Sequence, residues 1–153
     1  MRMFVAAVRR SKALHHPWIN APDTTAKYHA YLERMAAPLN YGFLVCRPTD
    51  QALVGVINLS NIVYGVFRSG YLGYYAFSGF ERQGYMTQGL KAVVRYAFKT
   101  LKLHRLEANI QPGNEASIRL VASCGFHKEG YSPRYLKING RWRDHERWAI
   151  LAA

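Results

Sequence analysis

The chain has 153 residues, which suits one domain, and half of them are hydrophobic, which is enough for a packed core. No apolar run approaches the roughly 20 residues of a membrane helix, and the first apolar run is too short for a signal peptide. The formal net charge of +12 favours an anionic partner, such as nucleic acid, the ribosome surface or a polyphosphate cofactor. Because the basic residues are spread along the chain, a merely basic surface explains the charge equally well.

The cysteines and histidines predict no metal site and no disulfide. Cys46 and Cys124 each lie in an apolar run, and no histidine or cysteine has a neighbour at metal-ligand spacing. We therefore expect reduced core thiols in a cytoplasmic protein.

The N-terminal third is predicted to be helical. Residues 3–14 suit a short helix, whereas the two prolines of residues 15–22 indicate a loop. Asp23 or Thr24 can cap a second helix that runs to about Met35.

Strands and helices alternate through the rest of the chain. Three strands are predicted at residues 42–47, 53–60 and 69–77, then a helix and an alternating strand at residues 105–111. Another helix follows Pro112-Gly113-Asn114 and ends at Gly125, and two strands flank the hairpin signal Asn139-Gly140. This order predicts an α/β fold with a mixed sheet.

The central stretch, residues 80–101, organises the chain. Its second half has a helical period, carried by Leu90, Val93, Val94, Ala97, Phe98 and Leu101. A polar turn containing Gly84 enters this helix directly after a strand. The first amides of a helix lack partners and its dipole is positive there, so this turn predicts a phosphate site, to which Arg82 adds a full charge.

The turn and three later motifs resemble one enzyme family. ERQGYM, from Glu81 to Met86, is similar to the acetyl-CoA pyrophosphate loop of the GNAT N-acetyltransferases, Gln/Arg-x-x-Gly-x-Gly/Ala. Gly84 matches that pattern, whereas Glu81 and Met86 depart from it. HRLEANIQPGNEAS, CGFHKEGY and LKINGRWRDH resemble, in order and spacing, the Rim-type ribosomal-protein alanine N-acetyltransferases.

The resemblance covers residues 42–151 and implies a single GNAT domain over residues 1–153. It implies a mixed, mostly antiparallel twisted sheet flanked by helices. Relatives begin with a strand before the first helix, whereas this sequence starts inside that helix, so we expect the usual first strand to be missing, unless the given sequence begins after it.

The resemblance also implies that acetyl-CoA is the cofactor. Its pyrophosphate would contact the turn, and its pantetheine arm the end of the preceding strand and the start of the next helix. The residues so implied are Arg82, Gln83, Gly84, Tyr85, Met86 and Thr87 in the turn, Tyr75, Ala76 and Phe77 in the strand, and Asn114 and Ser117 in the helix. For Asn114, a helix cap is an additional explanation.

Catalysis needs a group that stabilises the leaving thiolate and a route for the amine proton. Many GNAT enzymes have a tyrosine four positions after the serine, where this chain has Val121, so we assign Ser117 a hydrogen-bonding or water-relay role. Glu107, with Asn109 on the same strand face, is the candidate base, unless Glu107 only pairs with an arginine. Weak base machinery suits an α-amine, with a pKa near 8, better than lysine at about 10.4.

The predicted function is acetyl transfer to a protein N-terminal α-amine, within a ternary complex. The acceptor would contact His16, Trp18 and Tyr74 and approach between residues 15–20 and the hairpin at Asn139, although His15 and His16 also suit loop packing. A small-molecule amine acetyltransferase and a non-catalytic relative that binds ribosome or nucleic acid remain alternatives. Ribosome association is expected and membrane association is not; monomer and homodimer both stay open.

Overall fold

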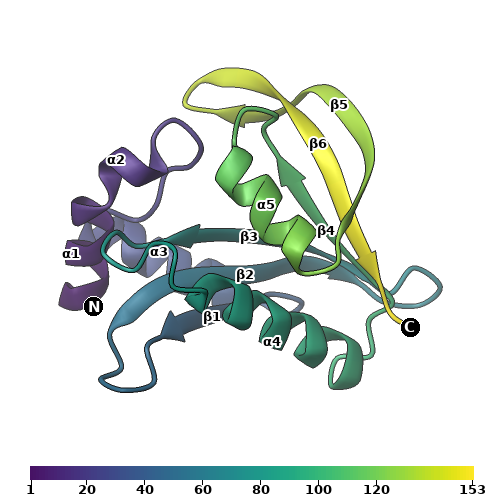
Figure 1. Cartoon of the computed structure of the whole chain (residues 1–153), viewed down its shortest axis with the longest axis horizontal. Coiled ribbons are helices and arrows are strands. Elements are labelled where there is room, and N and C mark those ends of the chain that lie inside the picture. Colours follow the sequence, from purple (N-terminus) through teal and green to yellow (C-terminus); the bar gives the residue numbers. More distant parts are fainter.

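The computed structural model describes all residues, 1–153, and has an α/β architecture built on a six-stranded sheet (Figure 1). The strand order is β1-β2-β3-β4-β6-β5, and every neighbouring pair is antiparallel except β3 and β4, which are parallel. The strands are β1 Tyr41–Cys46, β2 Leu53–Val63, β3 Ser69–Ala76, β4 Arg105–Ile110, β5 His127–Ile138 and β6 Arg141–Leu151. The mixed, mostly antiparallel sheet confirms the predicted fold class.

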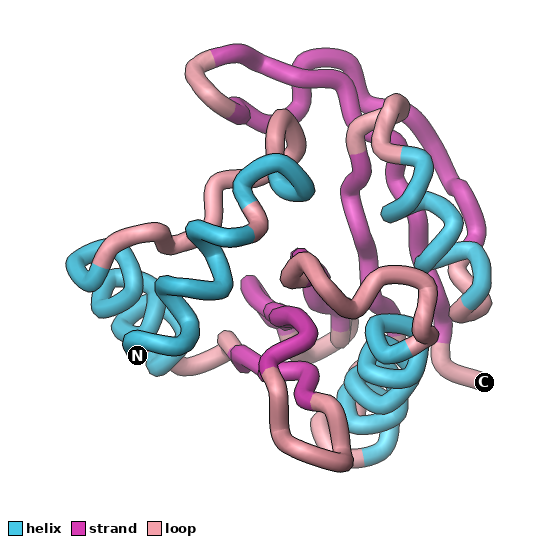
Figure 2. The backbone as a smooth tube through the Cα atoms, turned by 60° about the vertical axis from the view of Figure 1, so that its left-hand side comes forward, coloured by secondary structure: helices cyan, strands magenta, loops and turns pink.

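Helices cover both faces of the sheet, and each face has its own apolar core. The helices are α1 Arg2–Arg10, α2 Lys12–His15, α3 Thr25–Ala36, α4 Tyr85–Lys99 and α5 Glu115–Ser123. The larger core lies under α4 and α5, and the smaller one joins α1 and α3 to β2 and the end of β3. Figure 2 shows these two helix groups well apart in the molecule.

The predicted first helix is divided in two. α1 ends at Arg10, and α2 begins after Ser11, which is only 1% exposed. The Ser11 hydroxyl donates to the Ala7 carbonyl (2.7 Å) and accepts from the Ser78 N–H (2.9 Å). A serine bonded to the preceding turn competes with the regular helical pattern, and here it also ties the helices to the loop after β3.

Local sequence signals set the start of α3, the end of α5 and the turn between β5 and β6 as expected. Thr24 caps α3 by accepting from the Lys27 N–H (3.2 Å). Gly125, which follows α5, has φ +90°, and Asn139 and Gly140 both have positive φ in the turn between β5 and β6. These are the conformations that the glycine stop and the Asn-Gly hairpin predicted.

β3 and β4 separate part-way along, and this separation positions the site. They pair from Ser69 with Arg105 to Leu72 with Ala108. Beyond that register β4 pairs only with β6, and β3 only with β2. The backbone edge of β3 from Gly73 to Ala76 is therefore not paired with β4.

The described chain enters the fold through α1, with no strand before it, and β1 forms one edge of the sheet. No helix has the length and apolar character that a membrane crossing would require.

Candidate active site

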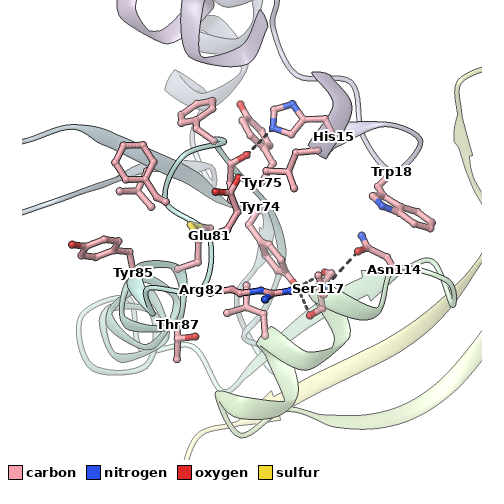
Figure 3. A pocket seen from close by; sticks show the side chains of 18 of the residues that line it. His15, Trp18, Tyr74, Tyr75, Glu81, Arg82, Tyr85, Thr87, Asn114 and Ser117 are labelled. Atoms are coloured by element: carbon pink, nitrogen blue, oxygen red, sulfur yellow. Dashed lines mark hydrogen bonds between the residues drawn. The ribbon is translucent and has the colours of Figure 1, made fainter. Parts of the chain in front are cut away.

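A cavity of about 390 Å³ opens where β3 leaves β4 (Figure 3). Its walls come from α2 and the loop after it, the end of β3, the turn into α4, and the first turns of α4 and α5. The lining residues are Leu14, His15, Trp18, Ile19, Val54, Tyr74, Tyr75, Ala76, Phe77, Phe80, Glu81, Arg82, Gly84, Tyr85, Met86, Thr87, Asn114, Ala116, Ser117 and Leu120.

One end of the cavity carries free backbone donors. The backbone at Gly84 is left-handed, with φ +79°, and Gly84 is the residue that precedes α4. The first helical hydrogen bond runs from the Gln88 N–H to the Gly84 carbonyl (3.0 Å), so the amides before Gln88 are free for a ligand. Arg82 lies in the same turn, also with positive φ, and lines the cavity. This arrangement suits an anion.

Glu81, the unusual acid of this turn, has a structural partner. Its carboxylate accepts from the Gly79 N–H at 2.9 and 3.1 Å. This contact holds the turn before α4, and it leaves a negative charge on the cavity wall.

Met86, the other departure from the family pattern, fills space against Gly55 of β2. A β-carbon on Gly55 would collide with the Met86 sulfur and would lie 2.8 Å from the Tyr75 carbonyl oxygen. The missing side chain at 55 therefore accommodates the large residue at 86.

The opposite wall brings two hydroxyl groups together. The Tyr74 Oη and Ser117 Oγ atoms lie 2.7 Å apart, and Tyr74 Oη is also 3.2 Å from the Ser117 carbonyl oxygen (Figure 3). Burial raises the pKa of Tyr74 above its ordinary value, against the opposite effect of the Ser117 hydrogen bond. Asn114 caps α5, its side-chain oxygen accepting from the Ser117 N–H (3.4 Å). The cap explanation of Asn114 is confirmed, and Asn114 also lines the cavity.

The histidine in the cavity is His15, not the predicted His16. His15 is 6% exposed, and its Nε2 lies 2.8 Å from the Ala76 carbonyl oxygen, so Nε2 carries the hydrogen. Burial lowers the pKa of His15 below 6.5. His16 is exposed and outside the lining, whereas the predicted Trp18 lines the cavity. Leu14 and Ile19 also line it; no sequence signal marked them beyond their nearness to Trp18.

The predicted base does not reach the cavity. Leu106, Ala108 and Ile110 pack under α4 and α5, so Glu107 and Asn109 lie on the other face of β4. The Glu107 carboxylate accepts from Arg105 Nη2 (2.7 Å) and Nε (3.1 Å). Glu107 therefore pairs with an arginine, which was the alternative to its role as a base. Gln83 is likewise exposed and outside the lining.

The predicted acceptor route is bridged. Asn20, in the loop after α2, donates from its side-chain amide to the Asn139 side chain, and the Asn139 amide lies 3.5 Å from the Pro17 carbonyl. Figure 1 shows this loop reaching the tip of the β5–β6 hairpin. The two segments that would flank the predicted route therefore contact each other through these exposed side chains.

Comparison with known protein families identifies the class of protein to which this fold and cavity belong. The family described as "Acetyltransferase (GNAT) domain" matches residues 2–127, so the chain belongs to the GNAT acetyltransferases. This membership confirms the resemblance to GNAT acyltransferases that the sequence motifs indicated.

Named relatives agree with this membership. The chain is 40% identical over 121 residues to the probable N-acetyltransferase YjcK of Bacillus subtilis, covering 79% of this chain and 67% of that protein. It is 44% identical over 98 residues to the [ribosomal protein uS5]-alanine N-acetyltransferase of Escherichia coli, covering 64% of this chain and 50% of that one. A solved structure of Mycobacterium smegmatis RimJ in complex with CoA-disulfide superposes with a TM-score of 0.85 at 29% identity, covering 99% and 78% of the two chains.

Proposed function

We propose that the chain is an acetyl-CoA-dependent N-acetyltransferase that acts on a protein N-terminal α-amine. The observation that carries this proposal is the continuity of one cavity. It runs from the free amides of α4, past the unpaired edge of β3, to the Tyr74–Ser117 pair.

The residues present fit the cofactor. The α4 amides and Arg82 suit a pyrophosphate, because both supply positive potential at this end of the cavity. The backbone groups of β3 beyond Leu72 that point away from β2 suit the amides of a pantetheine arm, except the Ala76 carbonyl, which is bonded to His15. Bound there, acetyl-CoA would supply the acetyl group as a reactive thioester.

Transfer would be direct. The amine nitrogen bonds to the acetyl carbon, the carbon–sulfur bond breaks with its electrons on sulfur, and the amine proton passes to water. The chain's part is to orient the two reactants and to donate a hydrogen bond toward the sulfur. We assign that donor to Ser117, whose hydroxyl lines the cavity.

The lining favours an α-amine over a polyamine. Glu81 is the only carboxylate on the cavity wall, and it is bonded to the Gly79 backbone, so a polycation would find no dedicated acidic partner. The side beyond β3 is apolar, with Leu14, Trp18 and Ile19. His15 is a weak base there because burial lowers its pKa. A weak base suffices for an amine of pKa near 8 but not for lysine at about 10.4.

The E. coli relative is named for alanine acetylation of a ribosomal protein, which makes a ribosomal-protein N-terminus our first acceptor class. The test is competition between a peptide with a free N-terminal Ala or Ser and the same peptide blocked there but carrying a free lysine, with spermidine as a small amine. We expect thiol release from acetyl-CoA with the free N-terminus. Preference for the lysine peptide or spermidine would overturn the acceptor assignment.

Cofactor binding has its own test. Acetyl-CoA should raise the melting temperature, since it binds only the folded state. Gly84→Asp should abolish that rise by placing a negative charge at the phosphate end. Gly65→Asp is the matched control, because Gly65 has φ +75° against +79° at Gly84 and open space at both β-carbons, but lies outside the cavity. A normal rise in the Gly84 variant would refute the loop assignment.

A further inference from the structure

Tyr74 and Ser117 lie 43 residues apart in the sequence and meet in the cavity wall. Tyr74 comes from the free edge of β3, and Ser117 from the first turn of α5. Their oxygens are 2.7 Å apart, which is a full-strength O–H···O hydrogen bond. The direction of that bond decides where the serine hydrogen points.

We infer that Tyr74 is a positioning residue for acetyl transfer: it donates its hydrogen to Ser117 Oγ and thereby turns the serine hydrogen toward the leaving sulfur. This inference rests on the proposed function, because it requires the thioester to lie beside Ser117.

The hydrogen-bonding capacity of the two groups is compatible with this direction. A serine hydroxyl has one hydrogen and two acceptor positions, so a donor fixed on its oxygen leaves its own hydrogen for another partner. Apart from the bond with Tyr74, the Ser117 hydroxyl has no hydrogen-bond partner within the protein. Because burial raises the pKa of Tyr74, the phenol keeps its hydrogen and remains a donor throughout the working pH range.

The same raised pKa argues that Tyr74 does not transfer its proton. A buried phenolate is costly, so passing the tyrosine proton on to a thiolate would be uphill. Tyr74 therefore acts through Ser117 by orientation. Val121 occupies the position at which many GNAT enzymes have a tyrosine. Tyr74 is instead one residue further from the sulfur and acts through Ser117.

A different arrangement makes Tyr74 purely structural. Its hydroxyl also lies 3.2 Å from the Ser117 carbonyl, and donation there would only tie β3 to α5. The serine would then donate to the tyrosine, and its hydrogen would not reach the sulfur. The two arrangements predict different behaviour of a bound thiol.

The decisive measurement is the pKa of the coenzyme A thiol when it is bound, followed by the ultraviolet absorbance of the thiolate. Desulfo-coenzyme A provides the blank for protein tyrosines and cysteines. A hydrogen bond to the thiolate lowers the thiol pKa. We expect Tyr74→Phe and Ser117→Ala to raise it relative to the native protein, each by about one pH unit, and the double variant to raise it no further than Ser117→Ala.

Turnover gives the second measurement. Tyr74→Phe should lower kcat by about tenfold, the effect of one hydrogen bond of ordinary strength, with little change in KM for acetyl-CoA. Tyr31→Phe is the matched control, since it removes another buried tyrosine hydroxyl, bonded to Asn58 at 2.6 Å outside the cavity. It should lower the melting temperature but leave kcat unchanged.

Two outcomes would overturn the inference: an unchanged thiol pKa in Tyr74→Phe, or kcat losses that add in the double variant. Failure of the proposed function would look different, because native protein would then show no thermal shift with acetyl-CoA.

Discussion

Glu81 lies in the turn that enters α4, the proposed phosphate site, where its carboxylate has two opposing effects. Its bond to the Gly79 N–H holds the turn, but its charge opposes an anionic ligand. Glutamine offers the same accepting oxygen without the charge.

Glu81→Gln should therefore tighten acetyl-CoA binding by about threefold at low salt, as expected for an exposed charge pair. The gain should shrink at high salt, where the charge is screened. Titration calorimetry checks both, with Glu33→Gln on α3 as the control for net charge. Equal affinities in the native and Glu81→Gln proteins at low salt would contradict the prediction.

His15 makes folding stability depend on pH. Burial lowers its pKa below the ordinary value of 6.5, so the unfolded chain takes up the proton first as pH falls. The contribution of neutral His15 to folding stability is therefore fully present above pH 6.5. This contribution is lost as the pH falls below 6.5 toward the lower pKa of His15 in the folded state.

His15→Gln should flatten that loss, because the glutamine amide can still donate to the Ala76 carbonyl but does not titrate. Urea unfolding between about pH 7 and pH 5 measures the two slopes. His16→Gln, at an exposed neighbour, should keep the native slope. Equal slopes for His15→Gln and native protein would remove His15 as the cause.

At the scale of elements, the strand–turn–helix unit of β3 and α4 depends on β2 behind it. Gly55 pairs with Ala76 at the end of β3 and lies against Met86 in the first turn of α4. The end of the cavity at the α4 amides is thus supported by a residue that does not line it.

Gly55→Ala should destabilise the protein by about 1–3 kcal/mol, the usual cost of overpacking, and weaken acetyl-CoA binding. Adding Met86→Ala should restore only part of the stability, because the new methyl group would still meet the Tyr75 carbonyl oxygen at 2.8 Å. Melting temperatures check both. Gly73→Ala, with open space around its β-carbon, should be nearly neutral for stability. A neutral Gly55→Ala would show that β2 does not support the turn.

At the scale of the whole molecule, the chain contains 21 lysines and arginines but only 9 acidic residues. Such a field attracts anionic segments and repels basic ones. Acceptor choice should therefore depend on residues that never enter the cavity.

Peptides with N-terminal alanine and acidic residues further along should have lower KM values than peptides with basic residues there. The difference should largely vanish near 1 M salt, where the Debye length is about 3 Å. Initial rates for the two peptides across a salt series provide the check. A preference that salt does not alter would point to specific contacts instead.

Short-range signals in the sequence predicted most of the fold. The apolar period of α4, the cap at Thr24 and the Asn-Gly turn involve residues within a few positions of each other, so their hydrogen bonds can be anticipated locally. The break at Ser11 could not, because its partner Ser78 lies 67 residues away.

The candidate site was only partly predictable for the same reason. Alternation placed Glu107 and Asn109 together on one face of β4, but it could not say which face turns toward the cavity. Nor could adjacent His15 and His16 be distinguished, because the sequence predicted a loop there and a loop has no period. The contact of His15 with Ala76 is decided by how α2 packs on β3.

The sequence by itself determined the family and the glycine turn into α4, because these are carried by contiguous segments. Tertiary structure alone decided that β3 leaves β4 after Leu72, that Glu107 belongs to Arg105, and that Tyr74 meets Ser117. The physical reason is that strand order, sheet separation and helix docking minimise the free energy of the whole chain. No short segment contains the partners that set those contacts.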